Sequence, residues 1–193
     1  MSIRIMGTGS ALPARQVDNG ELEGMVDTSD EWIRERTGIG SRHVSTGETV
    51  VSLAAEACER ALENAGRDAA SVELILAATC SAERGIPCAA CQVQSHLGAH
   101  RAAAFDLNAA CAGFLFALQT AWAYVEAGIY DNALIVGSEV LSKLVDWTDR
   151  STCILFGDGA GAVFVELCSE GGVLGLVQHS DGAAGGVLCC DSR

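Results

Sequence analysis

The hydrophobic and polar positions of this chain follow two alternating patterns. Short, nearly continuous apolar runs predict strands at 2–7, 72–79, 102–107, 132–138, 151–156, 160–167 and 173–178. Apolar residues spaced three or four apart predict helices at 28–37, 48–65, 91–99 and 112–127. The run VELILAAT is typical of a strand buried on both faces of a parallel sheet. Strands alternating with amphipathic helices therefore indicate an α/β fold with βαβ crossovers.

The ends of these elements carry their own signals. Gly7 and Gly9 are expected to end the first strand, and Thr28 and Glu31 have the spacing of a capping box. Glycines at 38, 66 and 128 are expected to stop helices. The sequence GDGAG at 157–161 is expected to form a tight turn between two strands.

The last strand pattern, VLGLVQ, has no helix pattern after it. A strand without its covering helix is an incomplete βαβ unit. We therefore expect two parts: residues 1–170 as an N-terminal unit, and residues 171–193 as the first strand of a C-terminal half whose remainder is absent from this chain.

Composition narrows the classes of function. The formal net charge of −13 argues against nucleic acid as a partner, because phosphate binding needs a basic surface. No apolar stretch reaches about 18 residues, which argues against a membrane-spanning helix. Nine cysteines without a signal-peptide pattern favour a reducing, cytoplasmic compartment. Cys88 and Cys91 have C-x-x-C spacing but no second pair of ligands follows, so no metal site is expected.

Cys111 is the candidate nucleophile. It lies in DLNAACAGF, where a strand pattern changes to a helix pattern. A strand-turn-helix of small residues can present a nucleophile at its apex, and the N–H groups of a helix beginning near Ala110 would favour the thiolate. The alternative is an ordinary buried thiol, which is common for cysteine.

Motifs along nearly the whole chain decide between these alternatives. They are GTGSALP at Gly7, MVDTSDEWI at Met25, RTGIGSRH at Arg36, AACQVQSHLG at Ala89, FDLNAACAGF at Phe105, VGSEVLS at Val136, TDR at Thr148 and LFGDGAGA at Leu155. In this order they resemble the 3-oxoacyl-acyl-carrier-protein synthase III family of ketoacyl synthases. The resemblance implies a thiolase-like fold, layered α-β-α-β-α when complete, of which this chain would be mainly the N-terminal βαβ half.

The same resemblance implies a function. Cys111 would take an acyl group from acyl-CoA, and the acyl-enzyme would condense with malonyl-acyl carrier protein as carbon dioxide leaves, which starts fatty acid synthesis. Trp32, Arg36, Thr37 and Arg150 would bind coenzyme A, with Trp32 stacking on the adenine. Ile86 and Leu141 would line the acyl pocket, Ile86 reaching in from the partner subunit of a homodimer. Acyl-CoA is then a substrate, and no cofactor is expected.

Two family residues have no counterpart here. The family places a catalytic His in an H-Q-A-N context and an Asn in a G-N-T-S-like context, and neither motif occurs in this sequence. The four histidines present, His43, His96, His100 and His179, have different neighbours and are interpreted as structural or surface residues. Without donors of that kind, condensation would slow by about 10²–10³-fold for each one lost.

Three other interpretations stay open. A nucleotide-binding oxidoreductase would explain GTGSAL, but Pro13 and a polar stretch follow where a phosphate-binding helix should begin. A Cys hydrolase would share Cys111 but needs a nearby His and access for water. A partner-dependent or non-catalytic subunit of a secondary-metabolite pathway would explain the missing His and Asn.

Overall fold

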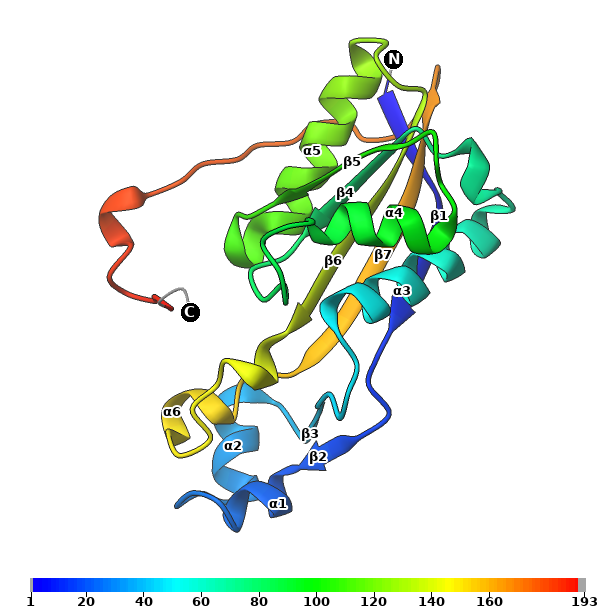
Figure 1. Ribbon diagram of the computed structural model, residues 1–193. Helices are drawn as coiled ribbons and strands as arrows, with labels where there is room; N and C mark the ends of the chain where they lie inside the picture. The colour runs from blue at the N-terminus through cyan, green and yellow to red at the C-terminus, as the bar shows by residue number, and fades with distance from the viewer. Residues whose placement is uncertain (1, 191–193) are drawn as a thin grey trace.

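A five-stranded mixed sheet forms the centre of the computed structural model, which describes residues 2–190 (Figure 1). The strand order is β1-β7-β6-β4-β5. Strands β6, β4 and β5 are parallel to one another, whereas β7 is antiparallel to both β6 and β1. The strands are β1 (Ser2–Ala11), β4 (Leu74–Ala78), β5 (Ala103–Leu107), β6 (Asn132–Val140) and β7 (Asp158–Cys168).

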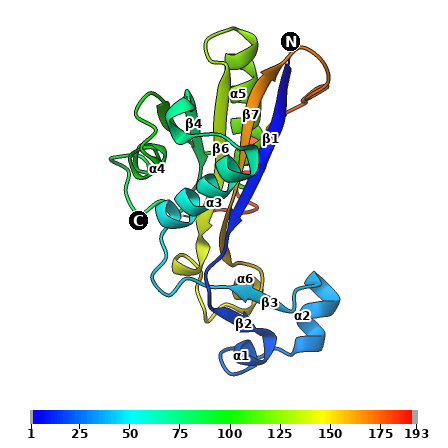
Figure 2. The ribbon, with the colours of Figure 1, turned by 90° about the vertical axis from the view of Figure 1, so that its right-hand side faces the viewer.

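Helices cover both faces of this sheet (Figures 1 and 2). On one face, α3 (Val50–Ala65) and α4 (Ala89–Leu97) pack through small buried side chains against residues such as Ile75 and Phe164. On the other face, α5 (Gly113–Glu126) packs against residues such as Leu76 and Ile135. All five residues of β4 are buried, which confirms the strand predicted from VELILAAT. The predicted α/β fold is therefore correct.

A smaller unit lies beyond one end of the sheet (Figure 1). It contains a two-stranded antiparallel sheet of β2 (Gln16–Asp18) and β3 (Ser41–His43), with the helices α1 (Asn19–Glu23), α2 (Asp30–Thr37) and α6 (Arg150–Cys153). Apolar residues of these elements form a separate core, among them Val17, Ile33 and Cys153. This core brings α6 beside α2, although more than 110 residues separate them in sequence.

Several predicted boundaries are wrong. Strand β1 does not end at Gly7 but continues to Ala11, and GDGAG is no turn, because its last four residues begin β7. The pattern at 151–156 lies partly in α6, whose N-cap Asp149 accepts a hydrogen bond from the Ser151 N–H. The N-cap of α2 is Ser29, whose side chain accepts from the Trp32 N–H, and not Thr28. In each case the boundary is set by strand pairing or by a capping hydrogen bond, which the local residue pattern does not reveal.

The strand predicted at 173–178 is also absent. Figure 1 shows this segment leaving the sheet, and Leu174 and Val177 are almost fully exposed. A strand needs a continuous row of hydrogen bonds to a neighbouring strand, whereas in the described residues this segment contacts β1 at Val173, whose N–H donates to the Ile3 carbonyl oxygen at 3.0 Å, and joins no sheet. The division at residue 170 itself stays a prediction. In residues 2–190, no helix is long and apolar enough to cross a membrane.

Candidate active site

Cys111 lies on the turn that joins β5 to α5. Strand β5 ends at Leu107, a single 3₁₀ turn (η2, Ala110–Ala112) follows, and α5 begins at Gly113. The preceding residue Ala110 has φ 46°, a left-handed conformation that costs a non-glycine residue free energy. The Asn108 side chain supports it by accepting a hydrogen bond of 3.1 Å from the Ala110 N–H. Cys111 is exposed at this sharp turn, as the predicted nucleophile elbow requires.

Helix α5 begins two residues after Cys111. Its N-cap residue, Ala112, makes no side-chain capping hydrogen bond, so the first N–H groups of the helix keep no side-chain partner there. A helix N-terminus stabilises an adjacent anion by about 0.3–1 kcal/mol. Gly113 lets α5 approach the sheet, because a Cβ there would lie 3.1 Å from the Cβ of Ala78 on β4. The helix therefore begins directly over the end of β4.

The turn after β4 is held by a carboxylate from β6. Glu139 accepts hydrogen bonds from the Cys80 N–H (2.7 Å), the Thr79 hydroxyl (3.3 Å) and the Ser81 hydroxyl. The Ser81 oxygen in turn accepts from the Val140 N–H at 2.9 Å. These hydrogen bonds connect the end of β4 to the end of β6. Glu139 was not identified from the sequence, although it lies within the quoted motif VGSEVLS.

Asp106 makes a second connection that the sequence did not reveal. Its carboxylate accepts hydrogen bonds from the N–H groups of Ala89 (2.8 Å) and Ala90 (2.7 Å), in the first turn of α4. The N-cap residue Cys88 offers that helix no side-chain hydrogen bond. Asp106 therefore caps α4 from the neighbouring strand and ties it to the strand that precedes Cys111. The sequence did contain one indication of this contact: the helix beginning at Ala89 has no capping residue, and Asp106 lies near the end of the next strand.

We expect Asp106→Ala to lower the free energy of unfolding by about 1–2 kcal/mol, because two N–H groups lose their acceptor. Urea unfolding followed by circular dichroism measures this change. Asp106→Asn keeps one acceptor oxygen and should lose about half as much. Equal losses in the two variants would contradict the capping role.

Trp32, Arg36 and Arg150 come together as the sequence predicted. Arg36 and Arg150 place their guanidinium carbons 4.2 Å and 4.6 Å from the centroid of the Trp32 ring. Arg150 also donates a hydrogen bond of 2.9 Å to the Asp27 carbonyl oxygen. Each guanidinium stacks on the indole by a cation–π interaction. An aromatic base stacking on Trp32 would compete with one of them for the same space.

Thr37 and Arg42 serve the structure of this unit. The Thr37 hydroxyl donates to the Ile33 carbonyl (2.7 Å) and accepts from the Ile39 N–H (3.0 Å), so its proton is already engaged at the end of α2. Arg42 is buried and donates to the Val17 and Ile154 carbonyls and to Asn19. Burial lowers the pKa of Arg42. Arg42 therefore connects segments of the fold, whereas Arg36 lies on the surface.

The two predicted acyl-pocket residues lie in different settings. Ile86 is 91% exposed, on the loop between β4 and α4. Leu141 is half-buried in the 3₁₀ turn η3 (Leu141–Lys143) that follows β6. Both assignments stay predictions.

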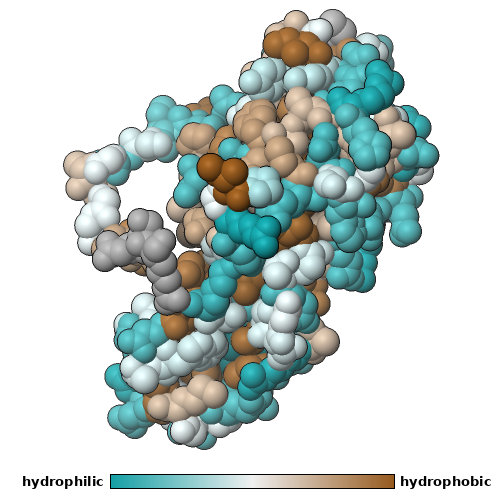
Figure 3. Space-filling model, in the orientation of Figure 1, coloured by the Kyte–Doolittle hydropathy of each residue, from teal (hydrophilic) through white to brown (hydrophobic). Residues whose placement is uncertain are grey.

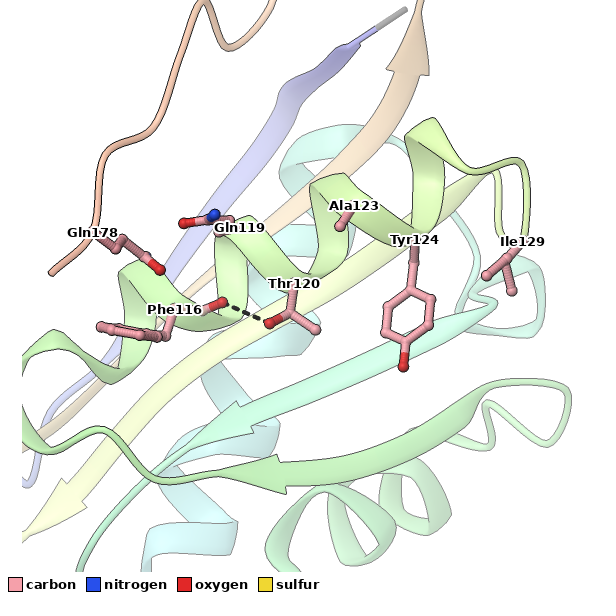
Figure 4. A pocket seen from close by; sticks show the side chains of 7 residues that line it. All are labelled: Phe116, Gln119, Thr120, Ala123, Tyr124, Ile129 and Gln178. Atoms are coloured by element: carbon pink, nitrogen blue, oxygen red, sulfur yellow. Dashed lines mark hydrogen bonds between the residues drawn. The ribbon is translucent and has the colours of Figure 1, made fainter. Parts of the chain in front are cut away.

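Two hollows lie beside α5. One, of about 490 Å³, is lined by seven residues that include Phe116, Gln119 and Gln178, with no charged side chain among them (Figure 4). The other, of about 370 Å³, lies among glycines of the sheet and Phe114. Figure 3 shows apolar surface along α5, where Leu115 is 52% exposed. Neither hollow is lined by a predicted site residue.

Two histidines make contacts away from this turn. A His43 ring nitrogen donates to the Pro13 carbonyl oxygen at 2.6 Å, and the other lies 3.1 Å from the Gln16 amide. His96 on α4 lies 3.4 Å from the Glu59 carboxylate on α3. These contacts agree with the structural and surface roles predicted for both.

Known proteins resemble this chain over most of its length. The model of the 3-oxoacyl-[acyl-carrier-protein (ACP)] synthase III family matches residues 105–182. The β-ketoacyl-[acyl-carrier-protein] synthase III of Synechococcus sp. strain WH7803 is 52% identical over 97% of this chain and 56% of its own. The chain thus spans about half the length of the curated relatives it matches.

Solved structures show the same fold. The 3-oxoacyl-[acyl-carrier-protein] synthase III of Aquifex aeolicus superposes with a TM-score of 0.86 and 45% identity, over 87% of this chain and 55% of that one. The priming β-ketosynthase of the R1128 polyketide pathway superposes with a TM-score of 0.91 and 39% identity, over 94% and 55%. The predicted thiolase-like fold is confirmed. Over nearly its whole length, the chain is similar to part of the β-ketoacyl-[acyl-carrier-protein] synthases III.

Proposed function

We propose that this protein is a ketoacyl synthase III, in which Cys111 carries the acyl group. The single observation that supports this most is the exposed Cys111 at a strained turn, beside the uncapped start of α5, in a chain about 50% identical to such synthases. The Cys111 thiolate attacks the acyl carbonyl carbon of an acyl-CoA, and the coenzyme A thiolate leaves. No resident cofactor takes part, since acyl-CoA is itself a substrate.

The second step is decarboxylative condensation. Malonyl-acyl carrier protein loses carbon dioxide, its carbanion attacks the acyl carbonyl carbon, and the Cys111 thiolate is released with 3-oxoacyl-carrier protein as product. This step begins fatty acid synthesis, and we place the protein in the cytoplasm. The hydrogen-bond donors that stabilise such an enolate are, by the family resemblance, a His and an Asn whose motifs are not among these 193 residues.

Coenzyme A binding is assigned to the Trp32 stack. Arg36 and Arg150 are both exposed and flank the indole, so they can bind phosphate oxygens while the base takes the place of one guanidinium on the ring. Thr37 contributes its acceptor oxygen at most, since its proton is engaged. The acetyl group is the expected acyl group, and longer ones are compatible with Ile86.

We expect Trp32→Ala to weaken coenzyme A binding by about tenfold, because one base–aromatic stack is lost. Isothermal titration calorimetry with coenzyme A measures this. Arg34→Ala is the matched control, since Arg34 lies on the same helix but pairs with Asp30 at 2.8 Å. Equal loss in both variants would contradict stacking on Trp32.

Two exposed features on one side of the sheet support a homodimer. Strand β5 is an edge strand with Phe105 36% exposed, and Ile86 stands out from the loop before α4. Unpaired strand edges readily pair with a second chain. In such a dimer, Ile86 of one subunit would end the acyl pocket of the other.

A second candidate is priming of a secondary-metabolite pathway, as a partner-dependent subunit. The similarity to the R1128 priming β-ketosynthase favours it. Intact mass spectrometry after incubation with acetyl-CoA and with longer acyl-CoAs tests both candidates. An acetyl adduct supports the fatty acid synthase, and an adduct only from longer acyl groups supports the second candidate. No adduct from any acyl-CoA would overturn the role of Cys111.

A further inference from the structure

A second thiol lies beside Cys111. Cys80 directly follows Thr79, whose N–H extends the β4–β5 pairing with a hydrogen bond of 3.4 Å to the Leu107 carbonyl oxygen. From the other side, Gly113 at the start of α5 packs against Ala78, two residues before Cys80. Both cysteines are exposed. Two exposed cysteine sulfurs are therefore present at a site where only one should take the acyl group.

Glu139 faces one of these two thiols. Its carboxylate accepts the Cys80 N–H at 2.7 Å and both flanking hydroxyls, those of Thr79 and Ser81, so the turn 79–81 is wrapped around a carboxylate. A carboxylate accepts hydrogen bonds but donates none, so it favours the protonated state of a neighbouring thiol. Cys111 instead lies on the turn that leads into α5, whose N-cap residue Ala112 makes no side-chain capping hydrogen bond.

We infer that Glu139 is a positioning residue that fixes the turn 79–81 beside Cys111 and holds its carboxylate against Cys80, so that Cys111 alone acts as the nucleophile. This inference rests on the proposed function, because it explains which of two neighbouring sulfurs takes the acyl group. It also gives Glu139, within VGSEVLS, a role in the chemistry of the site that the motif alone did not reveal.

The charged and titratable groups that face Cys80 agree with this role. Burial raises the pKa of Cys80 most, and together with the hydrogen bond to Glu139, the Glu139 charge, Cys111 and Cys190 it brings that pKa to about 11. Every one of these influences acts against the Cys80 thiolate. At pH 8, a thiol with that pKa is ionised in only about one molecule in a thousand.

The test measures alkylation of each cysteine by iodoacetamide between pH 6 and 10, using peptide mass spectrometry of the full chain. Alkylation joins the thiolate sulfur to carbon, and iodide leaves. In Glu139→Gln, we expect the midpoint of Cys80 alkylation to move to lower pH and its rate at pH 8 to rise about 3- to 10-fold. The sign follows because removing a negative charge lowers the pKa of a neighbouring thiol.

Ser81→Ala is the matched control. It removes one hydrogen bond to Glu139 and loosens the same turn, but the Glu139 carboxylate keeps its negative charge. A looser turn alone would raise the rate of Cys80 alkylation at high pH but would leave the pH midpoint of that alkylation unchanged. An unchanged midpoint in Glu139→Gln, or an equal shift in Ser81→Ala, would overturn the inference. Repeating the series with Cys190→Ser separates the influence of that residue.

Failure of the proposed function is a different result. In the wild type, acetyl-CoA should label Cys111 alone, and in Glu139→Gln some label should appear on Cys80. If acetyl-CoA labels neither cysteine, the acyl-transfer role of Cys111 fails. The pH midpoints of iodoacetamide alkylation still decide whether Glu139 controls Cys80, because that reagent needs no acyl-CoA site.

Discussion

Replacing Cys111 by Ala is expected to abolish the acyl adduct and to lower acyl transfer by about 10³-fold or more, because no other group supplies the covalent intermediate. Intact mass spectrometry after incubation with acetyl-CoA measures the adduct directly. The folded structure should change little, since Cys111 is exposed and donates no hydrogen bond that holds the turn. The loss would therefore reflect chemistry and not unfolding.

Cys91→Ala is the matched control for this variant. Cys91 is a partly exposed thiol on α4 whose sulfur contacts the Ala104 carbonyl oxygen at 3.5 Å. It should keep the full acetyl adduct. An adduct that survives in Cys111→Ala, or disappears in Cys91→Ala, would place the nucleophile elsewhere in the protein.

Replacing Gly9 by Ala is expected to lower the free energy of unfolding by about 2–4 kcal/mol. A Cβ at Gly9 would meet the Ala57 carbonyl oxygen and would lie 2.5 Å from the Ala61 nitrogen, both in the backbone of α3. Backbone atoms inside a helix cannot move aside as a side chain can, so β1 and α3 would have to separate. Urea unfolding measures the change.

Gly161→Ala provides the comparison within the same sheet. Gly161 lies on β7, the strand paired with β1, and a Cβ there meets nothing within 4 Å. Its unfolding free energy should stay within about 1 kcal/mol of the wild type. Similar losses at both positions would mean that the cost comes from replacing glycine in a strand and not from contact with α3.

The same contact settles one alternative from the sequence. GTGSAL resembled a phosphate-binding loop, but both of its glycines lie inside β1 and make room for α3. The close helix leaves no space at these positions for a pyrophosphate, so the oxidoreductase interpretation is wrong. A glycine motif indicates that another group approaches the backbone closely, and only the fold shows whether that group is a ligand or a helix.

Local patterns were sufficient for much of the fold and for the position of Cys111. The buried strand β4, the left-handed glycines that end α2 and α3, and the turn between β5 and α5 all follow from periodicity and residue type over a few positions. Motif order was sufficient for the family. These features depend on neighbours in sequence, which a sequence displays directly.

Other features required segments distant in sequence to meet. Four features join residues between 16 and more than 150 positions apart in the sequence. They are the antiparallel pairing of β7 with β1 and β6, the stacking of Arg150 on Trp32, the capping of α4 by Asp106, and the hydrogen bonds of Glu139 to the turn at Cys80. A carboxylate or a cation looks the same in sequence whether it faces water or a helix end. Its partner is chosen by how sheet and helices pack, because that packing sets which groups lose water and must find each other.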